Sequence, residues 1–147
     1  MLTQELLKAT GRLKIDVFNP DGSLKESREI NNLVVTVGKE FIASRMVGTS
    51  AGVMSHMAVG TDSTAPAAGN TALGAEAARV SLTSGSASGA VATYVATFGA
   101  GTGTGALTEA GIFNAGSSGT MLCRTAFSVV NKGASDAMTI TWTVTIS

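Results

Sequence analysis

The clearest strand pattern in the chain is Met138-Thr139-Ile140-Thr141-Trp142-Thr143-Val144-Thr145-Ile146. Its large apolar side chains alternate with threonines, so the two kinds of side chain fall on opposite faces of an extended chain. Threonine suits a pleated, half-exposed surface, and Trp142 is expected to anchor the core. The stretch therefore predicts a strand with one face buried.

The same alternation recurs towards the N-terminus. Leu13, Ile15 and Val17 alternate with charged residues, and the turn signal Asn19-Pro20-Asp21-Gly22 precedes a weaker alternation over Leu24–Ile30. We expect a hairpin here, with its second strand at an edge or in solvent. Further strands are predicted over 54–60, 79–83, 90–98, 107–114 and 121–130.

One segment, Gly38–Gly48, fits a helix. Apolar residues recur in it at helical spacing, and Gly48 is placed as a C-terminal stop. We expect Phe41, Ile42 and Met46 to pack on the sheet.

The remaining segments are expected to be breaks and loops. Asn31-Asn32 interrupts the strand pattern, 61–78 is predicted to be a long surface loop, and a short helical turn over 73–77 is left open. Ser84–Gly89 and Gly99–Gly105 are also predicted to be loops. The second has the glycine content of a phosphate-binding loop, but no lysine follows it and the next segment is a predicted strand, so we expect a hairpin connection.

About eight strands with turn-rich connections and one helix predict an all-β protein, a two-sheet β-sandwich of jelly-roll type with one short α-helix. The length of 147 residues fits one domain. We expect that domain to span 11–147. Residues 1–10 contain Leu2, Leu6 and Leu7 at roughly helical spacing and are predicted to form an N-terminal arm or short helix that docks on a partner.

Charge and hydropathy argue against several classes of partner. Ten basic and ten acidic residues cancel, so no nucleic-acid or anionic-membrane partner is expected. No run approaches the roughly 20 apolar residues that span a bilayer. Residues 1–8 lack the pattern of a secretory signal, and the single Cys123 forms no intrachain disulfide, so we expect a cytosol-like compartment.

The charges are unevenly distributed along the chain. Thirteen of the twenty lie in residues 1–45. The remaining surface must be polar through Thr, Ser and Gly, which cost less to desolvate than charged groups. Two interpretations stay open: a soluble β protein with a Ser/Thr surface, or a protein whose surface is covered by neighbouring protein molecules.

The sequence offers little for catalysis. His56 and Cys123 are each the only residue of their type, and both are expected to be packed in the core or at an interface. A zinc site needs three or four ligands. Convergence of Asp62, Glu76, Glu109 or Asp136 into a catalytic pair is not expected. We therefore predict no enzyme, no cofactor, no metal and no small-molecule substrate.

Several apolar residues are candidates for partner contact. Met46, Met54 and Met57 flank the charge-poor region and could form an adaptable contact patch or belong to the core. The residues predicted to contact a partner are Leu2, Leu6, Leu7, Met54, His56 and Met57.

Three blocks of sequence carry a resemblance to a known family. The first is Asn32-Leu33-Val34-Val35-Thr36-Val37-Gly38-Lys39 with the helix that follows. The second is 57–62 with 71–79, and the third is 107–114 with 121–125 and 140–144. Together these blocks are similar to small structural proteins of tailed bacteriophages, in particular head cement (decoration) proteins with a jelly-roll fold. The resemblance covers about residues 30–147.

The resemblance implies a virion protein without catalytic activity. Such a protein is assembled in the host cytoplasm, binds the capsid exterior and bridges neighbouring subunits of the major capsid protein, often as a dimer or trimer. In this chain we expect 1–10 to be the arm and 54–59 to lie near the subunit contact. Two alternatives remain: a tail, baseplate or fibre component, and a carbohydrate-binding β-sandwich module.

Overall fold

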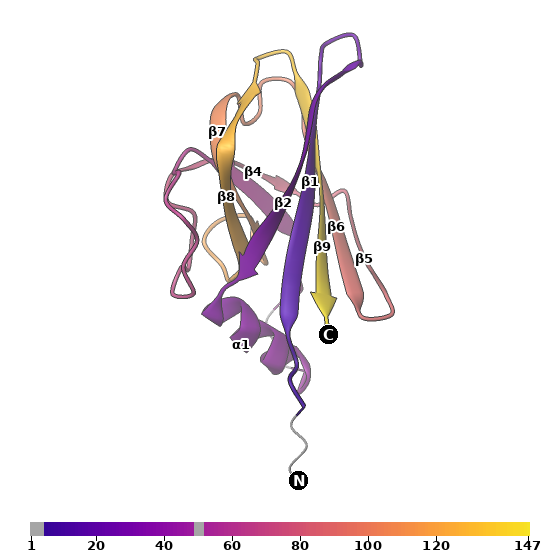
Figure 1. The fold of residues 1–147 in the computed structure, drawn as a ribbon, viewed down its shortest axis with the longest axis vertical. Helices are drawn as coiled ribbons and strands as arrows, with labels where there is room; N and C mark the ends of the chain where they lie inside the picture. The colour runs from indigo at the N-terminus through magenta and orange to yellow at the C-terminus, as the bar shows by residue number, and fades with distance from the viewer. Residues whose placement is uncertain (1–4, 49–51) are drawn as a thin grey trace.

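The computed structural model describes residues 5–48 and 52–147. Within them the chain forms nine strands and one helix (Figure 1). In chain order these are β1 (Ala9–Phe18), β2 (Leu24–Val34), α1 (Thr36–Arg45), β3 (His56–Gly60), β4 (Glu76–Ser81), β5 (Ser84–Ser88), β6 (Val91–Phe98), β7 (Gly105–Phe113), β8 (Met121–Lys132) and β9 (Ala137–Ile146).

The strands form one curled antiparallel sheet with the order β4-β3-β7-β8-β2-β1-β9-β6-β5. Strands β1 and β9 pair along their whole length, from Ala9 opposite Ile146 to Phe18 opposite Ala137. The outermost strands, β4 and β5, are consecutive in the chain and are joined by Leu82 and Thr83. The chain itself therefore connects the two edges of the curled sheet. The predicted all-β class with one short helix is confirmed.

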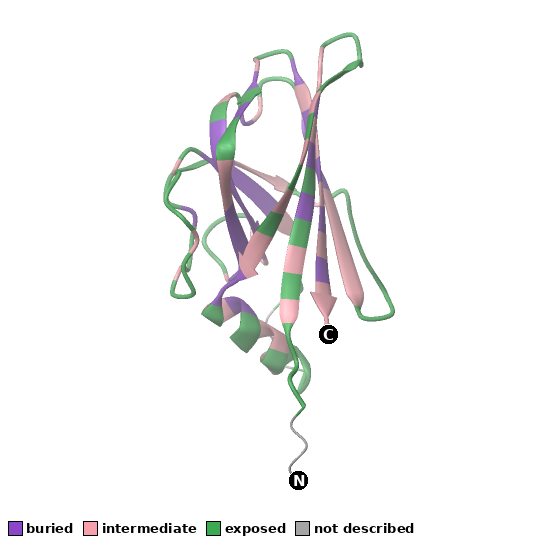
Figure 2. Ribbon diagram, viewed as in Figure 1, coloured by how far each residue is buried: buried purple, intermediate pink, exposed green. Residues whose placement is uncertain are grey.

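The core fills the inside of the curl, as the buried strand segments in Figure 2 show. The alternation that began the sequence argument is confirmed, because Met138, Ile140, Trp142 and Val144 are buried while the intervening threonines are half-buried. The predicted hairpin is also confirmed, and Gly22 adopts the positive φ of 86° that its turn requires.

Strand β2 is longer than predicted. Asn31 and Asn32 continue the strand opposite Arg12 and Gly11, so the predicted break was wrong. The reason lies in the partner strand: a Cβ on Gly11 would lie 1.9 Å from Asn32 Oδ1, so only glycine leaves room for that amide. Sequence patterns within β2 carry no information about this fit.

Strand β2 lies between β8 and β1, so the prediction of an edge strand was wrong, but its side towards β8 is only partly paired. Backbone pairing between β2 and β8 involves only Leu33 with Arg124 and Val34 with Cys123. Further along, the Arg28 guanidinium donates to the carbonyl oxygens of Ser128 and Val129 at 2.6 and 2.7 Å. A side chain thus bridges the two strands where the backbone ladder stops.

Helix α1 packs across one end of the sheet. Phe41 and Ile42 contact the core as predicted, but Met46 is 84% exposed, and the prediction that it packs on the sheet was wrong. The helix ends at Arg45, and Met46 already lies in the C-cap position. The helix is too short to meet the length that a membrane span requires.

Three predictions for the loops need correction. Ser84–Ser88 is strand β5, and β4 begins at Glu76 instead of residue 79. The helical turn left open over 73–77 does not form. Strand β5 has no apolar alternation because all its residues are exposed, and pairing with β6 is what makes it a strand. Segment 99–105 is not a hairpin connection, because β6 and β7 are not neighbours in the sheet.

Candidate functional site

Two of the four candidate carboxylates do converge, on a buried guanidinium. Glu109 is fully buried and Arg124 is 2% exposed, with their side chains 3.1 Å apart, and Asp62 Oδ2 lies 3.9 Å from Arg124 Nη2. The Glu109 carboxylate also accepts backbone N–H groups of Asp62, Gly74 and Ala75 at 2.7–3.0 Å. With its oxygens occupied by these donors, Glu109 is placed to hold the 61–75 segment against β7.

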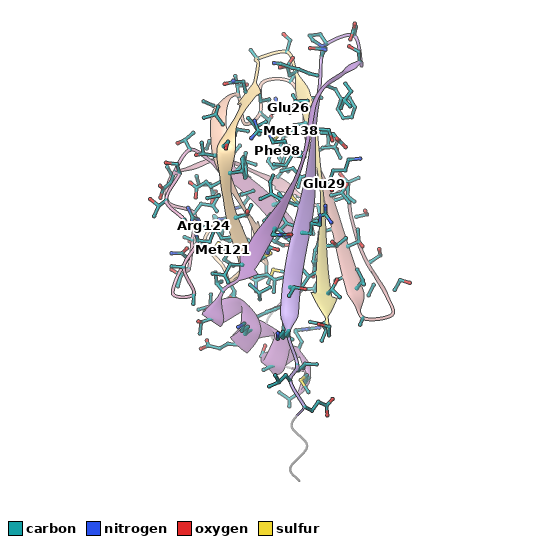
Figure 3. All side chains as sticks on the ribbon, viewed as in Figure 1. Glu26, Glu29, Phe98, Met121, Arg124 and Met138 are labelled. Carbon is teal, nitrogen blue, oxygen red and sulfur yellow. The ribbon has the colours of Figure 1, made fainter. Side chains whose placement is uncertain are left out.

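Arg124 completes this attachment from β8 (Figure 3). Its guanidinium donates to the Thr64 carbonyl oxygen at 3.0 Å and to Asn70 Oδ1 at 3.2 Å. The cluster joins β7, β8 and the long segment that precedes β4. We assign it a structural role, because a buried and fully paired carboxylate has no open position for a substrate.

The other charged residues after position 46 are also engaged within the chain. Arg79 pairs with Glu76 at 2.7 Å and lies over the Phe113 ring. Lys132 Nζ donates to the Gly99 carbonyl oxygen at 2.8 Å, and Asp136 pairs with Lys25 at 2.7 Å. The few charges of this region therefore make contacts within the chain. Its outer surface consists mainly of Ser, Thr, Gly and apolar residues, with Asp62 and Glu76 partly exposed.

Replacing Asp136 with asparagine should change the acid stability of the protein. The hydrogen bond from Lys25 and then the backbone N–H of Gly133 lower the pKa of Asp136 below its ordinary 3.8. A carboxyl group whose pKa is lower in the folded state stabilises the fold above its unfolded pKa, and this contribution is lost as pH falls through the folded pKa. The difference in melting temperature between wild type and Asp136→Asn should have its largest value at pH 6 and should become smaller below about pH 4.

Thermal unfolding followed by circular dichroism across this pH range measures the effect. Asp16→Asn is the matched control, since Asp16 contacts Lys14 at 3.8 Å on the surface. An equal difference at pH 6 and pH 3 would contradict the assignment.

The single cysteine and histidine do not form a pair. Cys123 is buried on β8, where desolvation raises the pKa of its thiol well above the ordinary value. His56 lies on β3 and contacts Ser55 Oγ at 2.8 Å and Ser81 Oγ at 3.4 Å. Strand β7 separates the two strands. Across the described ranges, no three His, Cys, Asp or Glu side chains gather in a way that could hold a metal ion.

An apolar groove lies beside α1. We define the helix end as the end of the sheet on which α1 lies. Three adjoining hollows of about 250, 460 and 350 Å³ surround the helix and share lining residues. We call them together the helix-end groove, and its central residues are Phe41, Ile42, Ala87, Tyr94, Val144 and Ile146.

Exposed apolar side chains gather around this groove. Leu7 and Met46 line one hollow, and Val53 lines another. Leu6 and Leu7 are 65% and 76% exposed, and Val47 follows Met46 directly after the helix. Large exposed apolar side chains grouped in one place are typical of a protein–protein interface.

The residues predicted to contact a partner lie in different environments. Leu6 and Leu7 are exposed at the helix end, and Leu2 lies outside the described residues. Met54 and Met57 are buried in the core cluster. The sequence left open whether they form a contact patch or belong to the core, and the structure places them in the core. His56 is half-buried at the start of β3. Residues 5–8 have neither helix nor strand, and β1 begins at Ala9, inside the range given to the arm.

Sequence reasoning missed the groove itself. Phe41 and Ile42 were assigned to the core, and Val144 and Ile146 to the buried face of the last strand. Nothing in the local pattern indicates that these side chains end at a hollow, because the hollow arises where α1, β6 and β9 meet. The apolar pair Met46-Val47 at the end of the helix pattern could have indicated a contact surface there. Helical spacing instead assigned Met46 to the face that packs on the sheet.

No protein family, curated protein or solved structure matches the chain.

Proposed function

We propose that the protein is a structural component of a tailed-bacteriophage particle that binds the capsid exterior and cements neighbouring subunits of the major capsid protein. The observation that carries this proposal is a broad uncharged surface on β5, β6 and β9. Val80–Thr108, which includes β5 and β6, contains no charged residue.

The outward side chains of β6 and β9 form this surface beside β5, and we call them the threonine face. On β9 they are Thr139, Thr141, Thr143 and Thr145, opposite Thr97, Val95, Thr93 and Val91 of β6. The face ends at β1, whose Arg12, Lys14 and Asp16 lie opposite Thr143, Thr141 and Thr139. Thr97 and Thr139 lie within hydrogen-bonding distance across the strands, with their hydroxyl oxygens 3.3 Å apart. Such a surface is cheap to desolvate, and depletion of charge is characteristic of interface cores.

A rigid scaffold supports the same role. We infer that the curled sheet belongs to the two-sheet sandwiches of jelly-roll type, in which β5, β6, β9 and β1 would oppose β4, β3, β7 and β8. The adjacency of the first and last strands and the connection between distant strands β6 and β7 favour this interpretation. A cement protein needs such a scaffold because each copy contributes a weak contact, and symmetric repetition makes the total strong.

The aromatic residues favour this proposal over a carbohydrate-binding module. Sugar-binding surfaces use exposed aromatic rings, whereas Trp142 is fully buried and Tyr94 is half-buried against the core. Every Phe of the chain is also buried or half-buried.

The test is to place one charge on the threonine face. Thr93→Lys introduces a cation opposite Ser86 and Thr143, where the neighbours are uncharged. We expect its occupancy on purified capsids to fall about tenfold, equivalent to about 1.4 kcal/mol of binding free energy. Its melting temperature should stay within a few degrees of wild type, because the site is on the outer face.

Occupancy is measured by adding purified protein to undecorated capsids and quantifying the bound copies. Ser27→Lys on the exposed side of β2 is the matched control and should bind like wild type. Equal binding of both variants would reject the threonine face as the contact. Antibody labelling confined to the tail, or absence of the protein from purified particles, would reject the capsid assignment.

A further inference from the structure

We propose that a second copy of this chain docks at the helix end, with residues 5–7 of each copy lying in the helix-end groove of the other. The proposal deepens the proposed function, because it specifies how the particle protein would self-associate. It is tested on purified protein without capsids, so the two can fail separately.

The path of the N-terminal segment makes it available to a neighbour. Lys8 and Ser147 exchange two backbone hydrogen bonds, with Lys8 N to Ser147 O at 2.7 Å and Ser147 N to Lys8 O at 2.9 Å. These bonds fix the direction of the chain up to Lys8. Before Lys8, the chain runs past α1 and away from the sheet (Figure 1). Leu6 and Leu7 are thus presented outward at the position where a second copy would meet the helix end.

The groove has an unfilled part that its own segment does not line. Leu7 lines the hollow beside Ala43 and Met46, but not the hollow bounded by Val91, Tyr94 and Val144. Residues 5–7 span at most about 10 Å when extended, and they run past α1 and away from the sheet (Figure 1). An approaching copy meets no such constraint. Two leucine side chains entering this hollow would lose much of their exposed apolar surface, and this gain must exceed the costs of association.

The charges near the groove also favour a second copy of this chain as its occupant. Glu5 directly precedes the two leucines, and Lys8 and Lys39 lie on the rim of the groove. A segment that inserts Leu6 and Leu7 would bring its Glu5 towards the basic rim of the other copy. We expect this attraction to set the position of the segment along the groove more than to strengthen the binding.

Symmetry determines the size of the assembly. The segment and the groove lie at the same end of each molecule, so two copies related by a two-fold axis satisfy both contacts at once. The structure therefore favours a closed dimer over a trimer or a filament. Met46, Val47 and Val53 lie around the same end and would be covered in such a dimer.

Sedimentation equilibrium of the purified 147-residue chain tests the proposal. Leu6→Ser/Leu7→Ser removes the inserted side chains, and Ala87→Trp fills the groove from the exposed strand β5. Each variant should raise the dimer dissociation constant at least tenfold. Leu24→Ser, which alters an exposed apolar residue at the hairpin turn away from α1, is the matched control and should dimerise like wild type.

Mixing the two defective variants gives the sharpest result. The mixed dimer keeps one intact contact, formed by the unaltered segment of Ala87→Trp and the unaltered groove of Leu6→Ser/Leu7→Ser. The mixture should therefore associate more tightly than either variant alone. Melting temperatures close to wild type confirm that both variants fold.

Two results would overturn the proposal. The first is a chain that stays monomeric at millimolar concentration, and the second is a dimer whose dissociation constant does not respond to Leu6→Ser/Leu7→Ser. If the N-terminal segment instead binds only the capsid protein, the purified chain should stay monomeric, and Leu6→Ser/Leu7→Ser should lose occupancy on capsids.

Discussion

Replacing Arg124 with methionine should lower the free energy of unfolding by about 3–5 kcal/mol, because it leaves a buried carboxylate without its countercharge. Glu109 is fully buried, and Arg124 is the cation that contacts it, at 3.1 Å. Methionine has a similar volume, so the loss is mainly electrostatic and not a cavity effect. The three backbone N–H donors remain but cannot neutralise the charge.

The same substitution should loosen the 61–75 segment. Arg124 also holds the Thr64 carbonyl oxygen and the Asn70 side chain, so their hydrogen bonds disappear with it. We expect limited proteolysis to cut within 61–75 in Arg124→Met under conditions that leave wild type intact.

Urea denaturation followed by the fluorescence of the buried Trp142 measures the stability change. Arg12→Met is the matched control, since the ion pair of Arg12 with Glu29 is more than half exposed and should contribute less than about 1 kcal/mol. A loss of 1 kcal/mol or less in Arg124→Met would show that the cluster is not a stabilising clamp.

Gly38→Ala should destabilise the protein by about 3 kcal/mol, although alanine is the better helix former. In a free helix this change would stabilise by about 1 kcal/mol. Here a Cβ would lie 2.0 Å from the carbonyl oxygen of Leu122, a backbone atom of β8 that cannot rotate away. Relieving the clash requires α1 to move off the sheet. We therefore expect a loss of stability in the upper range of those caused by over-packing.

The displaced helix should also disturb the groove that α1 helps to form. We therefore expect Gly38→Ala to weaken dimerisation as well as lower the melting temperature. Gly69→Ala is the matched control, because nothing lies within 4 Å of a Cβ at that position. A Gly38→Ala protein as stable as wild type would contradict the close contact between α1 and β8.

Much of the strand content could be predicted from local pattern. Leu13, Ile15 and Val17 alternate clearly, and β1 buries all three. Strand β5 could not be found in this way, because Ser84–Ser88 has no apolar face and forms a strand only through pairing with β6. The exposed leucines at 6 and 7 were identified, whereas Met54 and Met57 have the same apolar character and are buried. Hydrophobicity alone does not distinguish a contact surface from a core.

Local sequence pattern was enough to indicate the buried face of the clearly alternating strands, the turn at 19–22 and a helix that overlaps the observed Thr36–Arg45. These properties depend on residues two to four positions apart, so they can be read locally. Tertiary contacts alone set the order of the strands, the meeting of Asp62, Glu109 and Arg124, and the groove beside α1. Those features join residues far apart in the chain. The entropic cost of closing such loops changes slowly with their length, so the local pattern leaves many strand pairings nearly equivalent.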